Sequence, residues 1–207
     1  MPTERFINLP ERKRRQIYDA GMEEFIQVSY EKASINKIIQ RAGISRGSFY
    51  TYFADKKDLF SYIVGEESER IRVFWLECAE MNHGNLWKTS EAFFDYSIDH
   101  SKDRMLQLVH NIVDVEKVYG EIHYLRKSND PQVRILIETL YKAVDKTEFK
   151  DQGIETFSRI LSMIFVTQAE CISWCYNHLE DKEKVKKIFH EKLEILQYGI
   201  CKQQLKS

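Results

Sequence analysis

The segment from Ser34 to Lys56 constrains the fold more than any other part of this chain. Its first half carries apolar residues at the spacing of one helix face, at Ile35, Ile38, Ile39 and Ala42. Ser34 precedes this stripe, and its hydroxyl can accept a hydrogen bond from a free backbone N–H of the first turn. Gly43 follows the stripe, where a residue without Cβ adopts the left-handed backbone that ends a helix. The pattern predicts a short capped helix followed by a tight turn.

A second, shorter helix is predicted after the turn. Ser45 can cap it, and Phe49 and Phe53 lie four residues apart, so both anchor the same face to a core. The remaining face is polar and points outward, with Arg46, Gly47, Ser48, Thr51 and Tyr52. Asp55 caps a third helix, and Asp58 suits its positive end. Two helices around a glycine turn form a helix-turn-helix, whose second helix enters a DNA major groove.

The residues from Ala42 to Phe53, with Lys56 and Leu59, resemble the signature of TetR-type transcriptional regulators. Two positions depart from that signature. Ser29 stands where the family usually has glycine, and Ile39 where it usually has alanine. Beyond this region, only the chain length and an all-helical pattern agree with the family.

The resemblance implies an all-α protein with two parts. Residues 1–60 would form a three-helix DNA-binding domain, and residues 61–207 a helical domain that binds an effector and dimerises. The expected function is a homodimeric repressor that a small molecule releases from a palindromic operator. At this point the sequence leaves open the operator sequence, the effector and the regulated genes. It also leaves open whether the protein represses or activates transcription.

The resemblance also implies which side chains contact DNA. Those expected to hold phosphates are Ser34, Ser45, Tyr50, Tyr52 and Lys56, and those expected to face base edges are Arg46, Gly47, Ser48 and Thr51. An arginine binds guanine O6 and N7 through two hydrogen bonds, and a threonine methyl contacts thymine. Lys56 begins a helix, where free N–H groups already favour a phosphate.

The same glycines allow a different interpretation, because residues 43–47 match G-x-S-x-G, the nucleophile elbow of α/β-hydrolases. That elbow requires a buried strand before the serine. Here a helical stripe containing Gln40 and Arg41 precedes Ser45, so we do not expect an enzyme. A helical enzyme or a small-molecule carrier without a DNA role is the alternative class. An enzyme would need a convergent set of titratable residues in a pocket, and a carrier would not need the exposed face from Arg46 to Thr51.

Charge is distributed unevenly, although the whole chain carries a net charge of only −1. Residues 1–60 contain three more basic than acidic residues, which fits a DNA-binding domain attached to an acidic body. Asn8, Pro10 and Glu11 predict the start of the first helix, and residues 1–7 would be a short mobile arm. Arg12 to Arg15 follow at once, where they either attract phosphates or form a solvated face.

The chain of 207 residues has 8 glycines and 3 prolines, which favours long helices with few turns. Periodicity predicts helices over 56–82, 86–100, 105–126, a stretch after Pro131, 154–178, and a last one from Glu180. No linker separates the two domains, so we expect them to move together. The apolar runs are too short to span a bilayer, and the N-terminus lacks a signal sequence, which favours a cytoplasmic protein. No cofactor motif or metal-ligand spacing is found among the 4 cysteines and 6 histidines.

The helix over 154–178 is apolar on more than one side. One face carries Phe157, Leu161, Ile164, Gln168, Cys171 and Cys175, and another Ile160, Phe165, Ile172 and Trp174. A helix apolar all round is covered on two sides. The resemblance implies a dimer built as a four-helix bundle from the last two helices of each chain, with Leu161 and Ile164 at the interface. The alternative is a fully internal helix.

Aromatic residues crowd the body and suggest an apolar effector pocket. Its candidate lining is Phe74, Trp75, Trp87, Phe93, Phe94, Tyr96, Tyr119, Tyr124 and Trp174. Polar residues inside apolar stretches could orient a ligand, namely His110, Asn111, Gln168 and Glu170. For most of these aromatics, an ordinary core is the competing interpretation.

Overall fold

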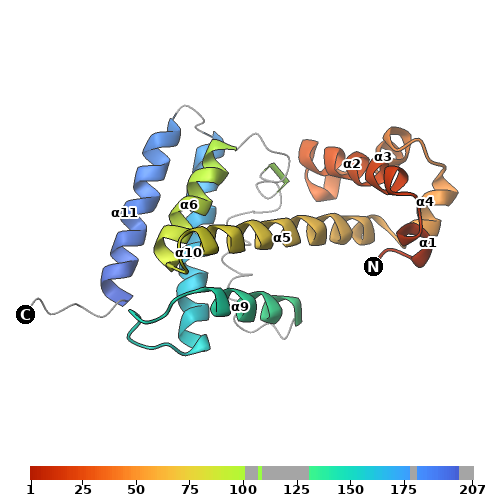
Figure 1. Ribbon diagram of the computed structural model, residues 1–207. Coiled ribbons are helices and arrows are strands. Elements are labelled where there is room, and N and C mark those ends of the chain that lie inside the picture. The colour runs from red at the N-terminus through yellow and green to blue at the C-terminus, as the bar shows by residue number, and fades with distance from the viewer. Residues whose placement is uncertain (101–106, 109–130, 178–180, 201–207) are drawn as a thin grey trace, which may run out of the picture. The chain divides into compact units, whose positions relative to one another are not determined.

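The computed structural model describes residues 1–100, 107–108, 131–177 and 181–200, and every regular element they form is a helix (Figure 1). The chain packs as two compact units. Unit 1 comprises residues 1–71 with 102–112, and unit 2 comprises 72–101 with 113–207. The helix expected over 105–126 lies almost wholly outside the described residues. The domain boundary expected after residue 60 stays a prediction.

Unit 1 contains the predicted helix-turn-helix. Its elements are α1 (Glu4–Ile7), α2 (Glu11–Gln27), the 3-10 turn η1 (Tyr30–Lys32), α3 (Ile35–Arg41), α4 (Arg46–Tyr52) and the first part of α5 (Lys56–Met81). α2 packs against α3, α3 against α4, and α1 against α4. The core side chains are at most 2% exposed and include Phe6, Ile17, Phe25, Ile38, Phe49, Phe53 and Leu59.

The structure corrects the expectation of a mobile arm at residues 1–7. Thr3 caps α1, and the Phe6 ring is fully buried, with its centroid 4.7 Å from that of Phe53. Asn8 ends α1 and does not cap the next helix; Pro10 occupies that position without a side-chain cap. The aromatic ring at Phe6 supplies the apolar contact that holds a four-residue helix in place.

Helix α5 ends at Met81, just before His83 and Gly84, the residues predicted to stop it. Both have left-handed backbones, with φ of 54° and 74°, and the Gly84 N–H donates to the Ala79 carbonyl at 2.8 Å. A Cβ at Gly84 would lie 2.9 Å from the backbone oxygen of Ala143 and the backbone nitrogen of Asp145. Glycine is therefore required both by the turn and by the close approach of the 143–145 backbone.

Unit 2 consists of the end of α5 with α6 (Leu86–Asp99), α9 (Pro131–Ala143), α10 (Ile154–Asn177) and α11 (Lys182–Ile200). α10 packs against α6, α9 and α11. α6 and α11 are joined by stacked rings of Phe94 and Phe189, 3.9 Å between centroids, and by a 2.9 Å contact between Asp95 and His190. None of the described helices combines the length and apolar character needed to cross a membrane.

The buried face of α10 belongs to the interior of its own protomer. Leu161 is 2% exposed and Ile164 is fully buried within the single chain. The expectation that these two residues form a subunit interface is therefore wrong. Periodicity had identified an apolar face without identifying what covers it.

Candidate nucleic-acid interface

The turn between α3 and α4 has the geometry predicted from its glycine. Gly43 has φ of 55°, its N–H donates to the Gln40 carbonyl at 3.2 Å, and the next N–H, of Ile44, donates to Ile39 at 3.1 Å. This pair of bonds is a Schellman motif, which satisfies the last carbonyls of α3. The turn therefore fixes the direction in which α4 leaves α3.

Helix α4 is held at both ends. Ser45 accepts a hydrogen bond from the Ser48 N–H at 3.0 Å, which confirms the predicted cap. At the other end Thr3 donates through its hydroxyl to the Thr51 carbonyl at 2.8 Å and through its N–H to Tyr52 at 3.0 Å. The Thr3 contacts were not predicted. The only sequence feature that could have indicated them is a threonine three residues before a buried phenylalanine. Ser45 follows a helix rather than a strand, so the geometry of a nucleophile elbow is not present there.

The outward face of α4 is polar and accessible. Arg46 and Gly47 are exposed, and Tyr50 is 46% exposed. Arg46 Nη1 donates to Asn36 Oδ1 at 3.2 Å, and its guanidinium carbon lies 5.8 Å from the centre of the Tyr50 ring. These two contacts restrict the arginine before any DNA is bound, which reduces the entropy lost on binding.

Two smaller side chains complete this face. The Thr51 hydroxyl donates to the Gly47 carbonyl at 2.9 Å, so its methyl group is left for apolar contact. The Ser48 hydroxyl lies 2.9 Å from the Ser45 hydroxyl. Tyr52 is half-buried, and its ring lies 6.1 Å from that of Phe6. Contacts of these residues with bases or phosphates remain predictions.

A buried glutamate positions α3, and sequence reasoning did not identify it. Glu24 of α2 is 1% exposed; Oε1 accepts from the Ser34 N–H at 3.1 Å and Oε2 from Arg41 at 3.0 Å. The Ser34 hydroxyl makes no capping bond, so that expectation was wrong, and Glu24 caps the helix from outside. The sequence feature that could have identified Glu24 is an acidic residue beside the apolar stripe of α2, next to Phe25.

The ammonium group of Lys56 is used inside the protein. Its Nζ donates to the carbonyls of Tyr30, Ala33 and Glu31 at 2.7, 3.0 and 3.2 Å. It also lies 4.6 Å from the centre of the Tyr30 ring. Since an ammonium has three protons, a phosphate at Lys56 would have to share them with the α2–α3 connection. The phosphate contact stays a prediction, and the structure adds a second role for this lysine.

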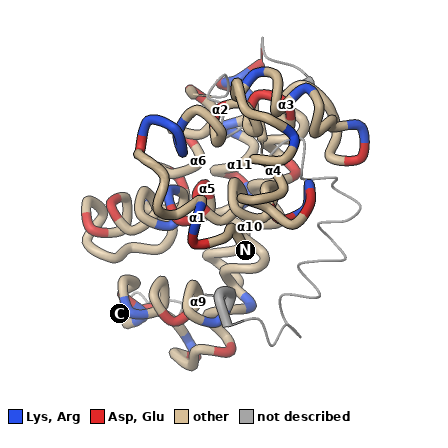
Figure 2. Tube along the Cα trace, turned by 90° about the vertical axis from the view of Figure 1, so that its right-hand side faces the viewer, with Lys and Arg blue, Asp and Glu red and all other residues tan. Residues whose placement is uncertain are grey.

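The basic run Arg12 to Arg15 is a blue stretch of the trace in Figure 2, and most of its charges have protein partners. Arg14 donates to the Ile7 carbonyl at 2.7 Å, Lys13 to the Gly43 carbonyl at 3.5 Å, and Arg15 pairs with Asp19 at 3.5 Å. Arg12 is exposed and has no partner in the part of the chain that the structure describes.

The start of α5 has the predicted acidic caps. Asp55 accepts from the Asp58 N–H at 2.8 Å, and Asp58 in turn accepts from the Ala54 N–H at 3.1 Å. Asp58 is 9% exposed. This reciprocal pair fixes where α5 begins, directly after the recognition helix.

The proposed effector residues of unit 2 divide between interior and surface. Trp75, Trp87, Phe93 and Phe94 are buried, Phe74 is half-buried, and Tyr96 and Trp174 are 39% and 38% exposed. Glu170 is exposed and pairs with Lys192 at 2.7 Å. His110, Tyr119 and Tyr124 lie outside the described residues. Phe74 packs on Phe93 and Tyr96, with centroids 5.6 and 4.4 Å apart.

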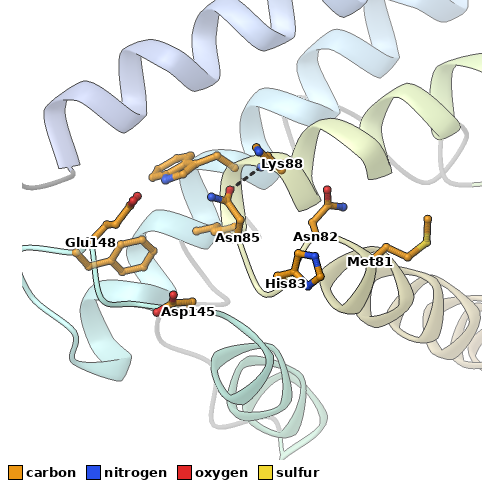
Figure 3. A pocket seen from close by; sticks show the side chains of 10 residues that line it. Met81, Asn82, His83, Asn85, Lys88, Asp145 and Glu148 are labelled. Carbon is orange, nitrogen blue, oxygen red and sulfur yellow. Dashed lines mark hydrogen bonds between the residues drawn. The ribbon is translucent and has the colours of Figure 1, made fainter.

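A surface pocket of about 430 Å³ lies where α6 begins (Figure 3). Trp87 and Phe149 line it, with His83, Asn85, Asp145 and Glu148 around them. The backbone N–H of Thr147 donates to Asp145 and keeps the pKa of that carboxyl below its usual value. Trp87 is the one predicted effector residue in this lining.

Comparison with known proteins agrees with the geometry of unit 1. Residues 17–63 match the family of bacterial regulatory proteins named tetR. The HTH-type transcriptional repressor Rv1474c of Mycobacterium tuberculosis is 37% identical over 59 residues, which are 28% of this chain and 32% of that protein. The fatty acid metabolism regulator protein of Bacillus subtilis is 27% identical over 193 residues, 91% of this chain and 95% of that one. A TetR family regulator from Chloroflexus aurantiacus superposes with a TM-score of 0.52 at 25% identity, covering 98% and 100% of the two chains.

A helix-turn-helix with an exposed, internally braced second helix defines a DNA-binding transcriptional regulator. Within that class, residues 17–63 match the tetR family, and a TetR family regulator resembles the chain over 98% of its length at 25% identity.

Proposed function

We propose that this protein is a homodimeric repressor that binds a palindromic operator through α4 and releases it when a small molecule binds unit 2. The observation that carries the DNA-binding part is the arrangement around α4. Hydrogen bonds hold this helix at both ends and Phe49 anchors its inner side, while Arg46, Gly47 and Tyr50 remain accessible. We also propose a cytoplasmic location, because the proposed binding partner is DNA.

The proposed dimer interface is the outer surface of α10 and α11. Large apolar side chains are exposed there, namely Met163, Trp174, Ile195 and Tyr198, at 51, 38, 72 and 78%. α10 and α11 pack against each other, so these residues belong to one helix pair. An exposed apolar surface of this kind is typical of a protein–protein interface.

The effector part of the proposal is supported by the composition of unit 2. Its described buried residues are apolar or uncharged, so a mainly apolar molecule would fit. The name of the Bacillus subtilis relative makes fatty-acid-derived molecules the first class to screen.

The test of DNA binding is selection of bound sequences from random duplexes, followed by titration of the selected duplex at several salt concentrations. We expect a near-palindromic site whose half-sites are about one helical turn, or a multiple of it, apart. The logarithm of the binding constant should fall with the logarithm of salt by roughly 0.9 per phosphate neutralised. Affinity independent of salt, or a single asymmetric half-site, would contradict the proposal. A reporter gene placed behind the site distinguishes repression from activation.

A further inference from the structure

The end of helix α4 lacks a local cap. The last carbonyls of a helix have no partner within it, and the glycine turn after α3 supplies donors for them from the next residues. After α4 the chain is extended at Phe53, with φ of −133°, and the following N–H, of Ala54, donates to Asp58. The carbonyls of Thr51 and Tyr52 therefore take their donors from elsewhere in the fold.

Thr3 supplies those donors from the start of the chain. Its hydroxyl donates to the Thr51 carbonyl at 2.8 Å, and its N–H donates to the Tyr52 carbonyl at 3.0 Å. α4 has only seven residues, and a helix this short is not stable alone. Contacts at its ends therefore decide whether its last turn keeps its shape.

Thr3 is itself held in place by the rest of unit 1. Its Oγ1 accepts a hydrogen bond from the Phe6 N–H at 3.4 Å. The Phe6 ring is fully buried, with its centroid 4.7 Å from that of Phe53 and 5.1 Å from that of Tyr62. Arg14 of α2 donates to the carbonyl of the last residue of α1 at 2.7 Å. The donor at Thr3 is thus tied to α2 and α5 as well as to α4.

Thr51 is restrained from two directions. Its hydroxyl donates to the Gly47 carbonyl at 2.9 Å, and its own carbonyl accepts from Thr3. The first bond fixes the side-chain rotamer and the second fixes the main chain, so together they set where the methyl group lies. Contact between two methyl groups weakens over a fraction of an ångström, so its strength depends on this placement.

We infer that Thr3 is a positioning residue for base recognition. Without touching DNA, it holds the end of α4 so that the Thr51 methyl meets the methyl group of a thymine. This inference rests on the proposed function, since it names how one base of the operator is read.

The first experiment measures amide hydrogen exchange in the full-length protein without DNA. Thr3→Val removes the hydroxyl and keeps the side-chain shape, so the amides of residues 50–53 should exchange roughly fivefold faster. Thr3→Asp still caps α1 but cannot donate, and should have the same effect, whereas Thr3→Ser should restore the wild-type rate. Unchanged exchange in Thr3→Val contradicts the inference.

The matched control is Thr139→Val in unit 2. It removes a threonine hydroxyl that donates to the Ile135 carbonyl at 2.7 Å, and it should leave the exchange of residues 50–53 unchanged. Equal acceleration in Thr139→Val and Thr3→Val would show a general loss of stability and contradict the inference.

The second experiment replaces each thymine of the selected operator by deoxyuridine, which lacks only the methyl group. In the wild type, one position in each half-site should bind about fourfold more weakly after this change. Thr51→Ser identifies that position, because the effect should disappear there. In Thr3→Val the effect should fall below about twofold, whereas Thr3→Ser and Thr139→Val should keep it.

Three results of the second experiment contradict the inference. The methyl effect could stay complete in Thr3→Val, or it could be absent from the wild type. Thr3→Val could also weaken the operator and unrelated duplexes equally, which would indicate a role in stability alone.

Failure of the inference and failure of the proposed function give different results. A wild type that selects no duplex contradicts the proposed function, while the exchange experiment without DNA still decides whether Thr3 fixes the end of α4. A palindromic operator whose methyl effect is the same in the wild type and in Thr3→Val supports the proposed function and contradicts the inference.

Discussion

Glu24 in α2 accepts a hydrogen bond from Arg41 in α3 at 3.0 Å, and the same carboxylate accepts from the backbone N–H of Ser34 at 3.1 Å. One buried side chain thus contacts both ends of the first helix of the helix-turn-helix. Arg41 also donates to Gln27 Oε1 at 2.7 Å, which adds a second bond from α2. The orientation of α3, and through the Gly43 turn that of α4, depends on this carboxylate.

We predict that Glu24→Gln lowers the free energy of unfolding by about 1.5–3 kcal/mol, because it weakens hydrogen bonds to a buried charge. Urea denaturation measures this change. The matched control is Glu138→Gln, which removes an exposed partner of Arg134 and should change stability by less than about 1 kcal/mol. Equal effects in the two variants would show that Glu24 does not brace α3.

Arg46→Ala should cost about 1–3 kcal/mol on the selected operator and relax discrimination at one base pair in each half-site. The reason is its position on the exposed face of α4, where Asn36 and Tyr50 hold it. Competition titrations with single-base operator variants measure both quantities. A uniform loss on every duplex would assign Arg46 to the backbone instead.

Lys56→Met should lower the free energy of unfolding by about 1.5–3 kcal/mol, because three carbonyls of the α2–α3 connection lose a charged donor. Lys57→Met is the control, since Lys57 is exposed, and should stay within about 0.5 kcal/mol. If Lys56 also holds a phosphate, the salt slope of DNA binding should fall by about one per subunit. If Lys56→Met leaves the free energy of unfolding unchanged but reduces the salt slope of DNA binding, Lys56 binds a phosphate and does not stabilise the α2–α3 connection.

Ile195→Glu should give folded monomers, because Ile195 is 72% exposed on α11 and a charge there is harmless unless a partner covers it. Sedimentation measures the assembly and circular dichroism the helix content. Leu161→Glu provides the contrast: its side chain is 2% exposed within the protomer, so this variant should lose folded structure instead. An Ile195→Glu protein that remains dimeric would place the interface elsewhere.

Burial raises the pKa of Cys171 from its ordinary 9.0 to about 11. The unfolded chain therefore loses this proton first, and the contribution of the thiol to stability falls as pH rises from about 9 to about 11. Denaturation at several pH values should show a smaller decline in Cys171→Ala than in the wild type over this range. Iodoacetamide at pH 8 should label the native Cys171 slowly, because little thiolate is present.

The sequence by itself determined the local parts of the helix-turn-helix. Gly43 at the end of α3, Ser45 at the start of α4 and the Asp55–Asp58 cap of α5 all act on backbone within a few residues. Such contacts follow from residue type and spacing alone, as does the alternation of buried Phe49 and Phe53 with the exposed face. The same is true of the ends of α5 and of α10.

Only the tertiary structure decided which distant residues complete these elements. Thr3 reaches a carbonyl 48 residues away, Lys56 turns inward to carbonyls at least 23 residues away, and Glu24 caps a helix that it does not belong to. Periodicity shows that one side of α10 is apolar, but Leu161 and Gln168 could have faced either a partner or their own core. The physical reason is that a hydrogen bond or a buried contact between helices depends on how they pack, and packing depends on all the side chains of both surfaces at once.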